Sequence, residues 1–363
     1  MKKLLCIISS MDVGGAETFL MKVFRAMDRT TYSIDFCVST EKQSYYENEI
    51  LSMSGRVFRV PPRSCAPFKR FSMIKKLARE YRYDCVLVCN QYELSVLDLI
   101  AAKKGGVKRL AYRANSTAIA SGGFAKNVLH AILRVPAMCI PTIYIAPSEL
   151  AAVFVFGKRI VKKGKVNIIH NGIDPDVFRF DADKRLKYRK ELGLDDRTVL
   201  IHVGRFSPEK NHAFLLRAFS EAVKQNPGLH LLLVGDGPDV DSIRMIAEEL
   251  QICDKVSFLG TRSDVPNLLM ASDLLLLPSL YEGMPNVVIE AQGTGLKCVV
   301  SDTVTREADI SGTVKYIPLK IDAWAEEMCA SGKSGRRSAL NDILVAAGYD
   351  IDSVVNRFIE TVF

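Results

Sequence analysis

Short apolar runs alternate with amphipathic segments along most of the chain. The length and apolar composition of residues 4–9, 85–89 and 274–277 predict buried strands. Between such runs, segments such as residues 18–27 carry apolar side chains at helical spacing. Strands that alternate with helices indicate a parallel sheet covered on both faces. Ligands of such sheets bind beyond the carboxyl ends of the strands.

The same pattern predicts further elements in both halves of the chain. Strands in the first half are expected over residues 33–39, 57–60, 109–113, 142–146 and 166–170. Strands in the second half are expected over residues 199–203, 230–234, 256–259 and 298–300. Helices are expected over residues 71–82, 94–102, 212–225, 240–250, 265–271, 285–292 and 351–363, and Ser148 is expected to cap one more. Residues 331–340 are polar and contain glycine, which predicts a loop.

A turn-rich segment, Asn-Gly-Ile-Asp-Pro-Asp at residues 171–176, interrupts this alternation. The length of 363 residues suits two domains. We therefore expect an N-terminal domain over residues 1–170 and a second domain over residues 171–345. A closing helix within residues 346–363 is expected to pack back on the N-terminal domain. The expected fold class is α/β, with two doubly wound, Rossmann-like domains.

Composition restricts the class of protein. Hydrophobic residues make up 48% of the chain and charged residues 25%, which is typical of a globular protein. The nine cysteines are scattered, and their spacing indicates neither a zinc site nor a disulfide framework, so we expect a reducing cytosol. No uncharged stretch reaches about 18 residues, and no membrane-spanning helix is therefore expected.

Charge is divided unevenly between the two halves. Residues 1–165 contain 27 basic and 12 acidic residues, a net charge of +15, whereas the rest contains 22 basic and 29 acidic residues, a net charge of −7. A basic N-terminal half suggests an anionic partner, such as a membrane surface, a lipid-diphosphate acceptor or nucleic acid. A solvated basic surface without a single partner is the alternative. The basic helix expected over residues 71–82 is either a membrane-surface helix or, more often for such a pattern, a core-packed helix with a solvated basic face.

One strand–loop–helix segment in the second half concentrates candidate chemistry. Glu282 and Glu290 stand eight positions apart after the strand at residues 274–277. Pro285 suits the first turn of the next helix, whose free N–H groups form an anion site, and Gly283 lets a ligand approach the backbone. Two carboxylates beside an anion site suit a ligand with phosphates and hydroxyls, such as a sugar nucleotide. Alone, they equally fit a surface glutamate and a helix glutamate of an ordinary fold.

Two other loops follow predicted strands and have residues that suit a phosphate. The loop at residues 12–17 places two adjacent glycines before a helix, although a tight turn for packing explains it nearly as well. It lacks the Gly-x-Gly-x-x-Gly pattern and the Lys-Ser/Thr pair of a nucleotide P-loop. In the second half, Arg205 and Lys210 follow the strand at residues 199–203. An arginine fork and a lysine point charge at a strand's carboxyl end suit a diphosphate, although an isolated pair of this kind more often consists of surface residues.

Several short motifs occur in order along nearly the whole chain. They are Gly-Gly-Ala-Glu at residues 14–17, His-Asn-Gly-Ile-Asp at 170–174, Gly-Arg-Phe-Ser-Pro-Glu-Lys-Asn at 204–211, Val-Gly-Asp-Gly-Pro at 234–238, Phe-Leu-Gly at 258–260, Pro-Ser at 278–279, Glu-Gly-Met-Pro-Asn at 282–286, and Gly-Leu-Lys-Cys-Val-Val-Ser-Asp at 295–302 with Glu307. Together they resemble the retaining GT-B glycosyltransferases of family 4, nearest the exopolysaccharide and capsule members of group 1. The resemblance implies two domains that face each other across a cleft.

The resemblance also implies roles for single residues. Arg205, Lys210 and Glu282 would be the catalytic residues, with the two cations stabilising the departing nucleotide diphosphate. Glu290 would accept hydrogen bonds from the ribose, and Gly15 would approach the diphosphate from the other domain. The implied donor-binding residues are Gly15, Gly204, Arg205, Lys210, Gly260, Thr261, Arg262, Glu282, Gly283, Met284, Pro285, Asn286, Val287 and Glu290.

One stretch departs from the family's pattern. Many relatives carry a histidine near the sugar in the N-terminal domain, but residues 111–117, Ala-Tyr-Arg-Ala-Asn-Ser-Thr, contain none. Tyr112, Arg113 and Asn115 are therefore expected on the acceptor side. The family's chemistry implies no bound metal and no cofactor besides the nucleotide-sugar substrate. Asp-x-Asp segments at residues 174–176, 239–241 and 350–352 are interpreted as caps and turns rather than as metal sites.

The resemblance implies a hexosyltransferase-type enzyme of surface polysaccharide biosynthesis, whether capsule, exopolysaccharide or O-antigen. It would move a sugar from a nucleotide sugar, a UDP-sugar in preference to a GDP-sugar, to a lipid-linked saccharide with retention. It would be cytoplasmic, contact the anionic inner leaflet peripherally and bind no nucleic acid. The alternatives are a catalytically weakened sugar-nucleotide-binding protein, a nucleic-acid-binding protein and a sugar-nucleotide epimerase. The last shares the architecture but lacks the Glu282 and Glu290 arrangement.

Overall fold

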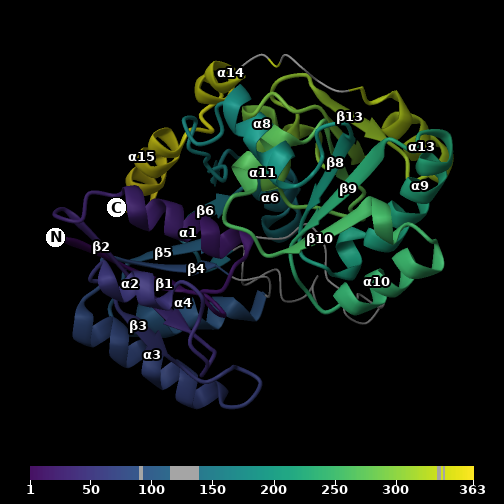
Figure 1. Cartoon of the computed structure of the whole chain (residues 1–363). Helices are drawn as coiled ribbons and strands as arrows, with labels where there is room; N and C mark the ends of the chain where they lie inside the picture. The colour runs from purple at the N-terminus through teal and green to yellow at the C-terminus, as the bar shows by residue number, and fades with distance from the viewer. Residues whose placement is uncertain (90–92, 115–138, 333–336, 338–339) are drawn as a thin grey trace. The chain divides into compact units, whose positions relative to one another are not determined.

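The computed structural model describes residues 1–89, 93–114, 139–332, 337 and 340–363. The chain divides into two compact units (Figure 1). One unit contains Met1–Gly172 together with Gly348–Phe363, and the other contains Ile173–Ala347. The chain therefore passes from the first unit to the second inside the turn-rich segment at residues 171–176.

In the described part of the first unit, seven parallel strands form a sheet in the order β3-β2-β1-β4-β5-β6-β7. The strands are β1 (Lys2–Ile7), β2 (Tyr32–Val38), β3 (Val57–Arg59), β4 (Cys85–Cys89), β5 (Arg109–Arg113), β6 (Ile143–Ala146) and β7 (Val166–Ile168). Each begins and ends within two residues of the strand that the apolar runs predict. The predicted parallel α/β architecture is confirmed for this unit.

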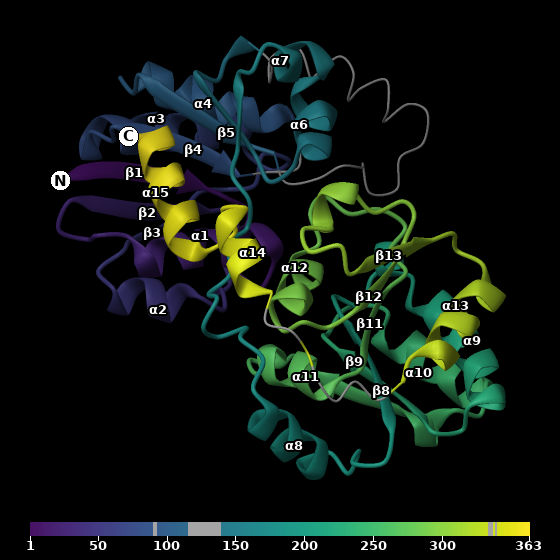
Figure 2. The ribbon, with the colours of Figure 1, turned by 90° about the horizontal axis from the view of Figure 1, so that it is seen from above.

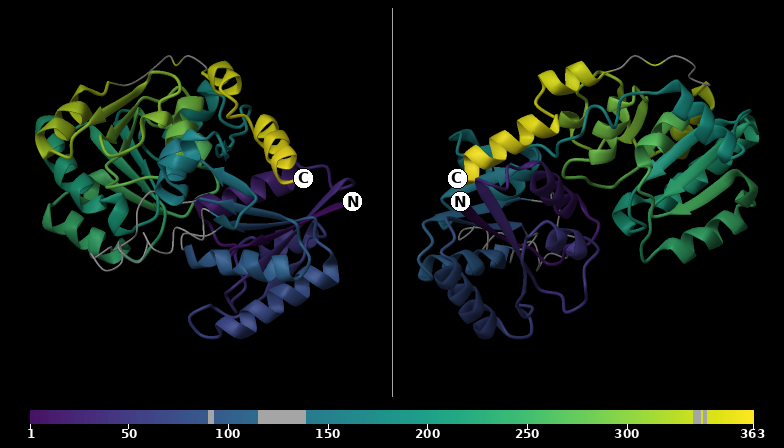
Figure 3. Two further views of the ribbon diagram at one scale, coloured as in Figure 1. Left: turned by 180° about the vertical axis from the view of Figure 1, so that it is seen from behind. Right: turned by 60° about the vertical axis from the view of Figure 1, so that its left-hand side comes forward.

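Helices cover both faces of this sheet because neighbouring strand residues face opposite sides. Leu4 of β1 packs in a core with α1 (Gly15–Ala26) and α15 (Ile351–Val362), whereas the adjacent Leu5 packs in a second core on the other face. Figure 3 shows the C-terminal helix α15, in yellow, beside the purple helix α1. The other described helices of this unit are α2 (Glu47–Ser52), α3 (Pro67–Tyr81), η1 (Glu93–Ser95), α4 (Val96–Lys104), α6 (Glu149–Phe156) and α7 (Lys158–Lys162).

In the described part of the second unit, six parallel strands form a sheet in the order β10-β9-β8-β11-β12-β13. The strands are β8 (Thr198–Val203), β9 (Leu229–Val234), β10 (Val256–Gly260), β11 (Leu274–Leu277), β12 (Cys298–Ser301) and β13 (Val314–Ile317). All except β13 were predicted. The edge strand β13 was missed because its four residues, Val-Lys-Tyr-Ile, are half polar, with Lys315 exposed.

Helices also cover both faces of the second sheet. On one face, α9 (His212–Gln225) packs against α13 (Ile321–Ala330), and Trp324 is fully buried in the core beneath them. Figure 2 shows α9, α10 and α13 on one side of the strands and α11 and α12 on the other. The other helices described here are α8 (Ala182–Glu191), η2 (Pro208–Lys210), α10 (Val240–Glu249), η3 (Cys253–Lys255), α11 (Val265–Ala271), α12 (Asn286–Gly293), η4 (Arg306–Ala308) and α14 (Asn341–Ala346).

Helix α8 was not predicted because it has no apolar stripe. The residues that it buries are Arg185 and Arg189. Both donate to Asp273, Arg185 at 2.5 Å and Arg189 at 3.1 Å. Asp273 is 4% exposed and also accepts from the backbone N–H of Val199 at the start of the sheet (2.8 Å). Hydrophobic periodicity cannot predict a helix whose buried side chains are arginines.

Helix starts follow the predicted capping residues in two places and differ in one. The Ser148 hydroxyl accepts from Ala151 N (3.1 Å) and caps α6, as predicted. The Asp350 carboxylate accepts from Ser353 N (2.8 Å), so this member of an Asp-x-Asp segment is a helix cap. The prediction that Pro285 lies in the first turn of α12 is wrong. Pro285 is the N-cap, because its ψ of 98° is extended rather than helical.

The basic helix α3 packs on the core of the first unit through Ile74 and Ala78. Its exposed residues include Phe68, Lys69, Lys76 and Arg79. Within the described residues, no helix is long and apolar enough to cross a membrane. The loop predicted over residues 331–340 falls mostly outside the described residues.

Candidate active site

The loops that follow four neighbouring strands meet at the carboxyl edge of the second unit's sheet. Gly204 N, after β8, donates to Val234 O at the end of β9 (2.9 Å). Leu280 N, after β11, donates to Glu209 O in the loop after β8 (2.8 Å). These bonds connect the loop at residues 204–211 to its neighbours on both sides. This edge is where parallel α/β sheets bind ligands.

Glycine is required where the loop after β9 touches the loop after β8. Gly235 has a φ of +137°, and a Cβ atom there would lie 2.0 Å from Gly204 O. A Cβ atom at Gly237 would lie 2.3 Å from Phe206 O. Contacts this short exclude any side chain. The Val-Gly-Asp-Gly-Pro segment at residues 234–238 therefore supports the backbone of the loop that contains Lys210.

Lys210 and Glu282 form an ion pair between two of these loops. Lys210 Nζ lies 2.5 Å from Glu282 Oε1. The two side chains are only 18% and 12% exposed. The structure therefore brings together two residues that the sequence placed 72 positions apart. The pair offers a cation for a phosphate oxygen and a carboxylate for a hydroxyl group.

A serine of the same loop also holds the Glu282 carboxylate. The hydroxyl of Ser279 donates to the same Oε1 atom (2.7 Å). Ser279 is fully buried, and its carbonyl oxygen accepts from the hydroxyls of Ser301, the last residue of β12, and Thr303, in the loop that follows. Glu282 is thus held by Lys210 from the loop after β8 and by Ser279 from its own loop, and Ser279 is itself held by Ser301 and Thr303. Such fixation is what a site needs if its charges are to be in place before the ligand binds.

The other predicted donor residues of this unit lie on the same loops or on α12. Arg205 is exposed in the loop after β8. Glu290 is half-buried in the second turn of α12, which begins at Asn286. Gly283 is half-buried, whereas Met284, Pro285 and Val287 are buried. The helix N-terminus and the Lys210 loop therefore belong to the same unit, and the donor-binding roles of these residues remain predictions.

The predicted base-binding segment lies at the end of β10. Gly260 has a φ of +64° and, like Thr261 and Arg262, is exposed. Arg262 donates from Nε and Nη2 to the two oxygens of Asp264, at 2.8 and 2.6 Å. The guanidinium lowers the pKa of Asp264. This pair fixes the turn that follows Gly260.

Two buried histidines lie beside the Lys210 loop, and sequence reasoning did not identify them as site residues. His202 is fully buried and His212 is 2% exposed. Their rings meet edge to face, with centroids 4.5 Å apart, and Phe206 stacks on His212 at 4.1 Å. Burial lowers the pKa of both imidazoles, to about 4 for His212, and the charge of Lys210 lowers them further. Both rings are therefore neutral near pH 7.

In the first unit, the glycine loop leads directly into α1. Gly14 is the N-cap, and the exposed Gly15 is the first helical residue. The side chain of Glu17 folds back over this turn, since a Cβ atom at Gly14 would lie 2.3 Å from its Oε2 atom. Burial raises the pKa of Glu17. The approach of Gly15 to a donor diphosphate remains a prediction.

The three residues predicted on the acceptor side have different environments. Tyr112 is 1% exposed and lies in the core against Phe156, with ring centroids 5.7 Å apart. Arg113 is also buried, donates to Asn171 Oδ1 (2.6 Å) and stacks on an aromatic ring of α1. Burial lowers the pKa of Arg113 to about 10. Asn115 lies outside the described residues.

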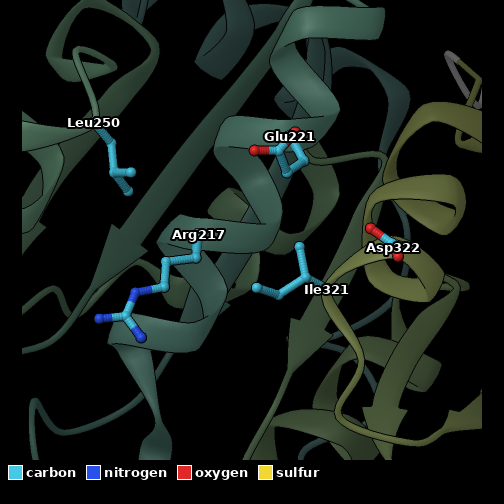
Figure 4. Close-up of a pocket in the computed structure, with 5 residues that line it drawn as sticks. All are labelled: Arg217, Glu221, Leu250, Ile321 and Asp322. Atoms are coloured by element: carbon cyan, nitrogen blue, oxygen red, sulfur yellow. The ribbon is translucent and has the colours of Figure 1, made fainter.

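A separate cavity of about 540 Å³ opens on the surface of the second unit (Figure 4). Arg217 and Glu221 line it from α9, Ile321 and Asp322 from the start of α13, and Leu250 from the end of α10. None of these five is a residue that the sequence predicted for the site. The candidate site is therefore defined by the converging loops, not by this cavity.

Comparison with known protein families identifies the family of this chain. The model of the family described as Glycosyl transferases group 1 matches residues 184–313, which include Lys210 and Glu282. The model described as Glycosyltransferase Family 4 matches residues 13–177. The chain belongs to the group 1 glycosyltransferases of family 4. This family membership makes it a glycosyltransferase (EC 2.4) and confirms the enzyme class that the motifs predicted.

Two relatives illustrate where this group 1 glycosyltransferase stands in the family. The Bacillus subtilis protein named glycosyltransferase EpsF is 29% identical to this chain over 368 residues. The match covers 99% of this chain and 95% of the EpsF chain. The Escherichia coli UDP-Gal:alpha-D-GlcNAc-diphosphoundecaprenol alpha-1,3-galactosyltransferase is 28% identical over 305 residues, covering 80% and 76%.

Solved structures confirm the GT-B fold of this glycosyltransferase. Anabaena HepE in complex with UDP-glucose superposes with a TM-score of 0.80 at 20% identity, and 99% of each chain is covered. Sucrose-phosphate synthase from Thermosynechococcus elongatus superposes with a TM-score of 0.74 at 18% identity, covering 99% of this chain and 98% of its own.

Proposed function

We propose that this glycosyltransferase transfers a sugar from a UDP-sugar to a lipid-linked saccharide, with retention, during surface polysaccharide biosynthesis. The observation that carries the proposal is the Lys210–Glu282 pair, held by Ser279 at the carboxyl edge of the sheet. Two comparisons support the donor and acceptor classes. The E. coli relative is named for a UDP-galactose donor and a diphosphoundecaprenol acceptor, and HepE was solved with UDP-glucose.

The reaction that we propose breaks the bond between the sugar's anomeric carbon and the diphosphate oxygen. The acceptor hydroxyl oxygen bonds to that carbon on the same face, and its proton passes to the departing phosphate oxygen. Negative charge builds on the diphosphate, where Lys210 and Arg205 stabilise it. Glu282 keeps the Lys210 ammonium in place and accepts a hydrogen bond from a sugar hydroxyl. Glu290 accepts hydrogen bonds from the ribose, and no metal or protein nucleophile takes part.

Contact with an anionic membrane is part of the proposal, because a lipid-linked acceptor is embedded in one. Helix α3 exposes Phe68 at its N-terminal end, where the side chain is 89% exposed. Lys69, Lys76 and Arg79 are exposed on the same helix. An apolar tip flanked by cations suits an anionic lipid surface. Vesicles of phosphatidylglycerol should retain the protein, and vesicles of phosphatidylcholine should not.

The test of the proposed function is transfer from labelled UDP-sugars to lipid-diphosphate saccharides, followed by NMR of the product's anomeric proton. We expect UDP release that depends on the acceptor and an anomeric configuration equal to that of the donor. An inverted product would overturn the retaining mechanism. UDP-sugar binding without transfer to any lipid-linked saccharide would instead favour a sugar-nucleotide-binding protein.

A further inference from the structure

A buried histidine extends the contact between the two strands that lead into the Lys210 and Glu282 loops. The backbone pairing of β8 with β11 joins Leu200 to Leu274 and Ile201 to Leu275. The next residue of β8, His202, then reaches Leu276 O with its Nδ1 atom (2.9 Å). A carbonyl oxygen only accepts, so Nδ1 carries the proton and donates. The His202 side chain thus adds one more connection between β8 and β11, at their carboxyl ends.

The other side of the same ring faces the start of the Lys210 loop. A Cβ atom at Gly204 would lie 3.2 Å from His202 Nε2 and 3.4 Å from the Cδ and Cε atoms of Lys210. The imidazole and the lysine stem therefore pack against the same glycine. Within the described residues, Nε2 has no hydrogen-bond partner. The ring of His212 closes this space from the side, with centroids 4.5 Å apart.

We propose that His202 is a positioning residue that holds the Lys210 loop and the Glu282 loop in one arrangement. Its bond to Leu276 O fixes β11 shortly before Ser279 and Glu282, and its ring supports Gly204 and the stem of Lys210. The inference rests on the proposed function, because it takes Lys210 and Glu282 to be the residues that His202 holds in place for catalysis. A shift of about 1 Å in a catalytic group costs up to ~100-fold in rate.

Two substitutions that both introduce a side-chain amide test the bond between His202 and Leu276 O. In His202→Asn, the amide nitrogen occupies the position of Nδ1 and can still donate to Leu276 O. In His202→Gln, the amide lies one methylene further out and cannot. We expect His202→Asn to keep kcat within about threefold of the wild type and His202→Gln to lower kcat about 10- to 100-fold, with little change in the KM for the UDP-sugar.

His230 provides the matched control. It is a half-buried histidine of β9 in the same sheet, and its Nε2 atom bonds to the Ser257 hydroxyl on β10 (2.8 Å). His230→Asn removes that bond but should leave kcat unchanged. Equal kcat in His202→Asn and His202→Gln, or an equal loss in His230→Asn, would overturn the proposal.

Amide hydrogen exchange separates this inference from the proposed function, because it needs no turnover. In the absence of substrate, His202→Gln should speed exchange in the loops at residues 204–211 and 279–285, and His202→Asn should not. If the wild type transferred no sugar, the proposed function would fail while this comparison still decided whether His202 joins the loops. Unchanged exchange in His202→Gln would contradict the link even if the enzyme were active.

Discussion

Lys210 Nζ lies 2.5 Å from Glu282 Oε1, and each partner enters the contact from a different loop of the same sheet edge. Both side chains are mostly buried, so each charge depends on the other for compensation. In the proposed function, the donor diphosphate would compete with Glu282 for the ammonium group. The pair therefore holds the cation at a defined position without a ligand, which is the preorganisation that the proposed reaction needs.

Removing the ammonium group should cost most of the transfer rate. For Lys210→Ala we expect kcat to fall by about 100- to 1,000-fold, because charge on the leaving diphosphate would lose a fixed cation. Steady-state release of UDP measures kcat in the variant and in the wild type. Lys224→Ala is the control, since Lys224 forms a similar pair with Glu221 (2.6 Å) but is 65% exposed. A Lys210→Ala enzyme with normal turnover would contradict the assigned role.

Glu290 should affect donor binding in addition to turnover. If its carboxylate accepts hydrogen bonds from the ribose, Glu290→Ala should raise the Kd for UDP by at least about 10-fold, given that a hydrogen bond to a charged group contributes ~1.5–3 kcal/mol. Calorimetric titration with UDP measures this effect. Asp239→Ala should leave the Kd unchanged, because Asp239 precedes α10 and no donor contact is assigned to it. Equal affinities for wild type and Glu290→Ala would remove the ribose role.

Acid should destabilise the fold through the histidines beside the Lys210 loop. The pKa of His202 and His212 is lower in the folded chain than the usual 6.5, and that of His212 is about 4. Below about pH 6.5 the unfolded chain binds protons that these buried rings do not, so stability is complete above that pH and declines toward pH 4.

The expected decline is up to ~1.4 kcal/mol per pH unit for each histidine. Urea unfolding at several pH values between 4 and 7 measures it. His212→Asn should flatten the dependence, since one titrating ring is removed. An identical pH dependence in the variant would show that His212 does not contribute.

Asp273 should be among the most costly residues to remove from the second unit. It accepts hydrogen bonds from Arg185, Arg189 and the backbone of Val199. Asp273→Ala would leave two buried guanidinium groups without their carboxylate, and we expect a loss of ~3–5 kcal/mol in the free energy of unfolding. Asp176→Ala is the control.

Urea denaturation compares the two aspartate variants. The Asp176 side chain is 89% exposed, so its removal should change stability by no more than about 0.5 kcal/mol. Similar midpoints for Asp273→Ala and the wild type would show that the buried cluster is not a source of stability.

The sequence predicted most of the fold because most elements bury apolar side chains. Helix α9 (His212–Gln225) and strand β11 (Leu274–Leu277) have the predicted bounds. Helix α8 was not predicted because its buried face consists of Arg185 and Arg189, which pair with the Asp273 carboxylate only in the folded chain. Strand β13 escaped because an edge strand can be short and half polar.

The candidate site was only partly accessible to sequence reasoning. Lys210 and Glu282 could be named from motifs, but nothing in the sequence showed that they contact one another across 72 positions. His202 belongs to no recognised motif, and its bond to the Leu276 carbonyl on a neighbouring strand is visible only in the folded chain. Tyr112 and Arg113 were named because they lie in the stretch where relatives carry a histidine, and only the packing shows that both are buried. Local patterns identify chemistry, whereas burial and partners depend on tertiary contacts.

The most direct test of the central claim is a thermal-shift titration of the purified protein with UDP-sugars and, for comparison, GDP-, ADP- and dTDP-sugars, without added metal. Binding to the folded state raises Tm by mass action. We expect UDP-sugars to raise Tm, Lys210→Ala to abolish that shift and Lys224→Ala to retain it. No shift with any UDP-sugar, or an undiminished shift in Lys210→Ala, would contradict a donor site built on the Lys210–Glu282 pair.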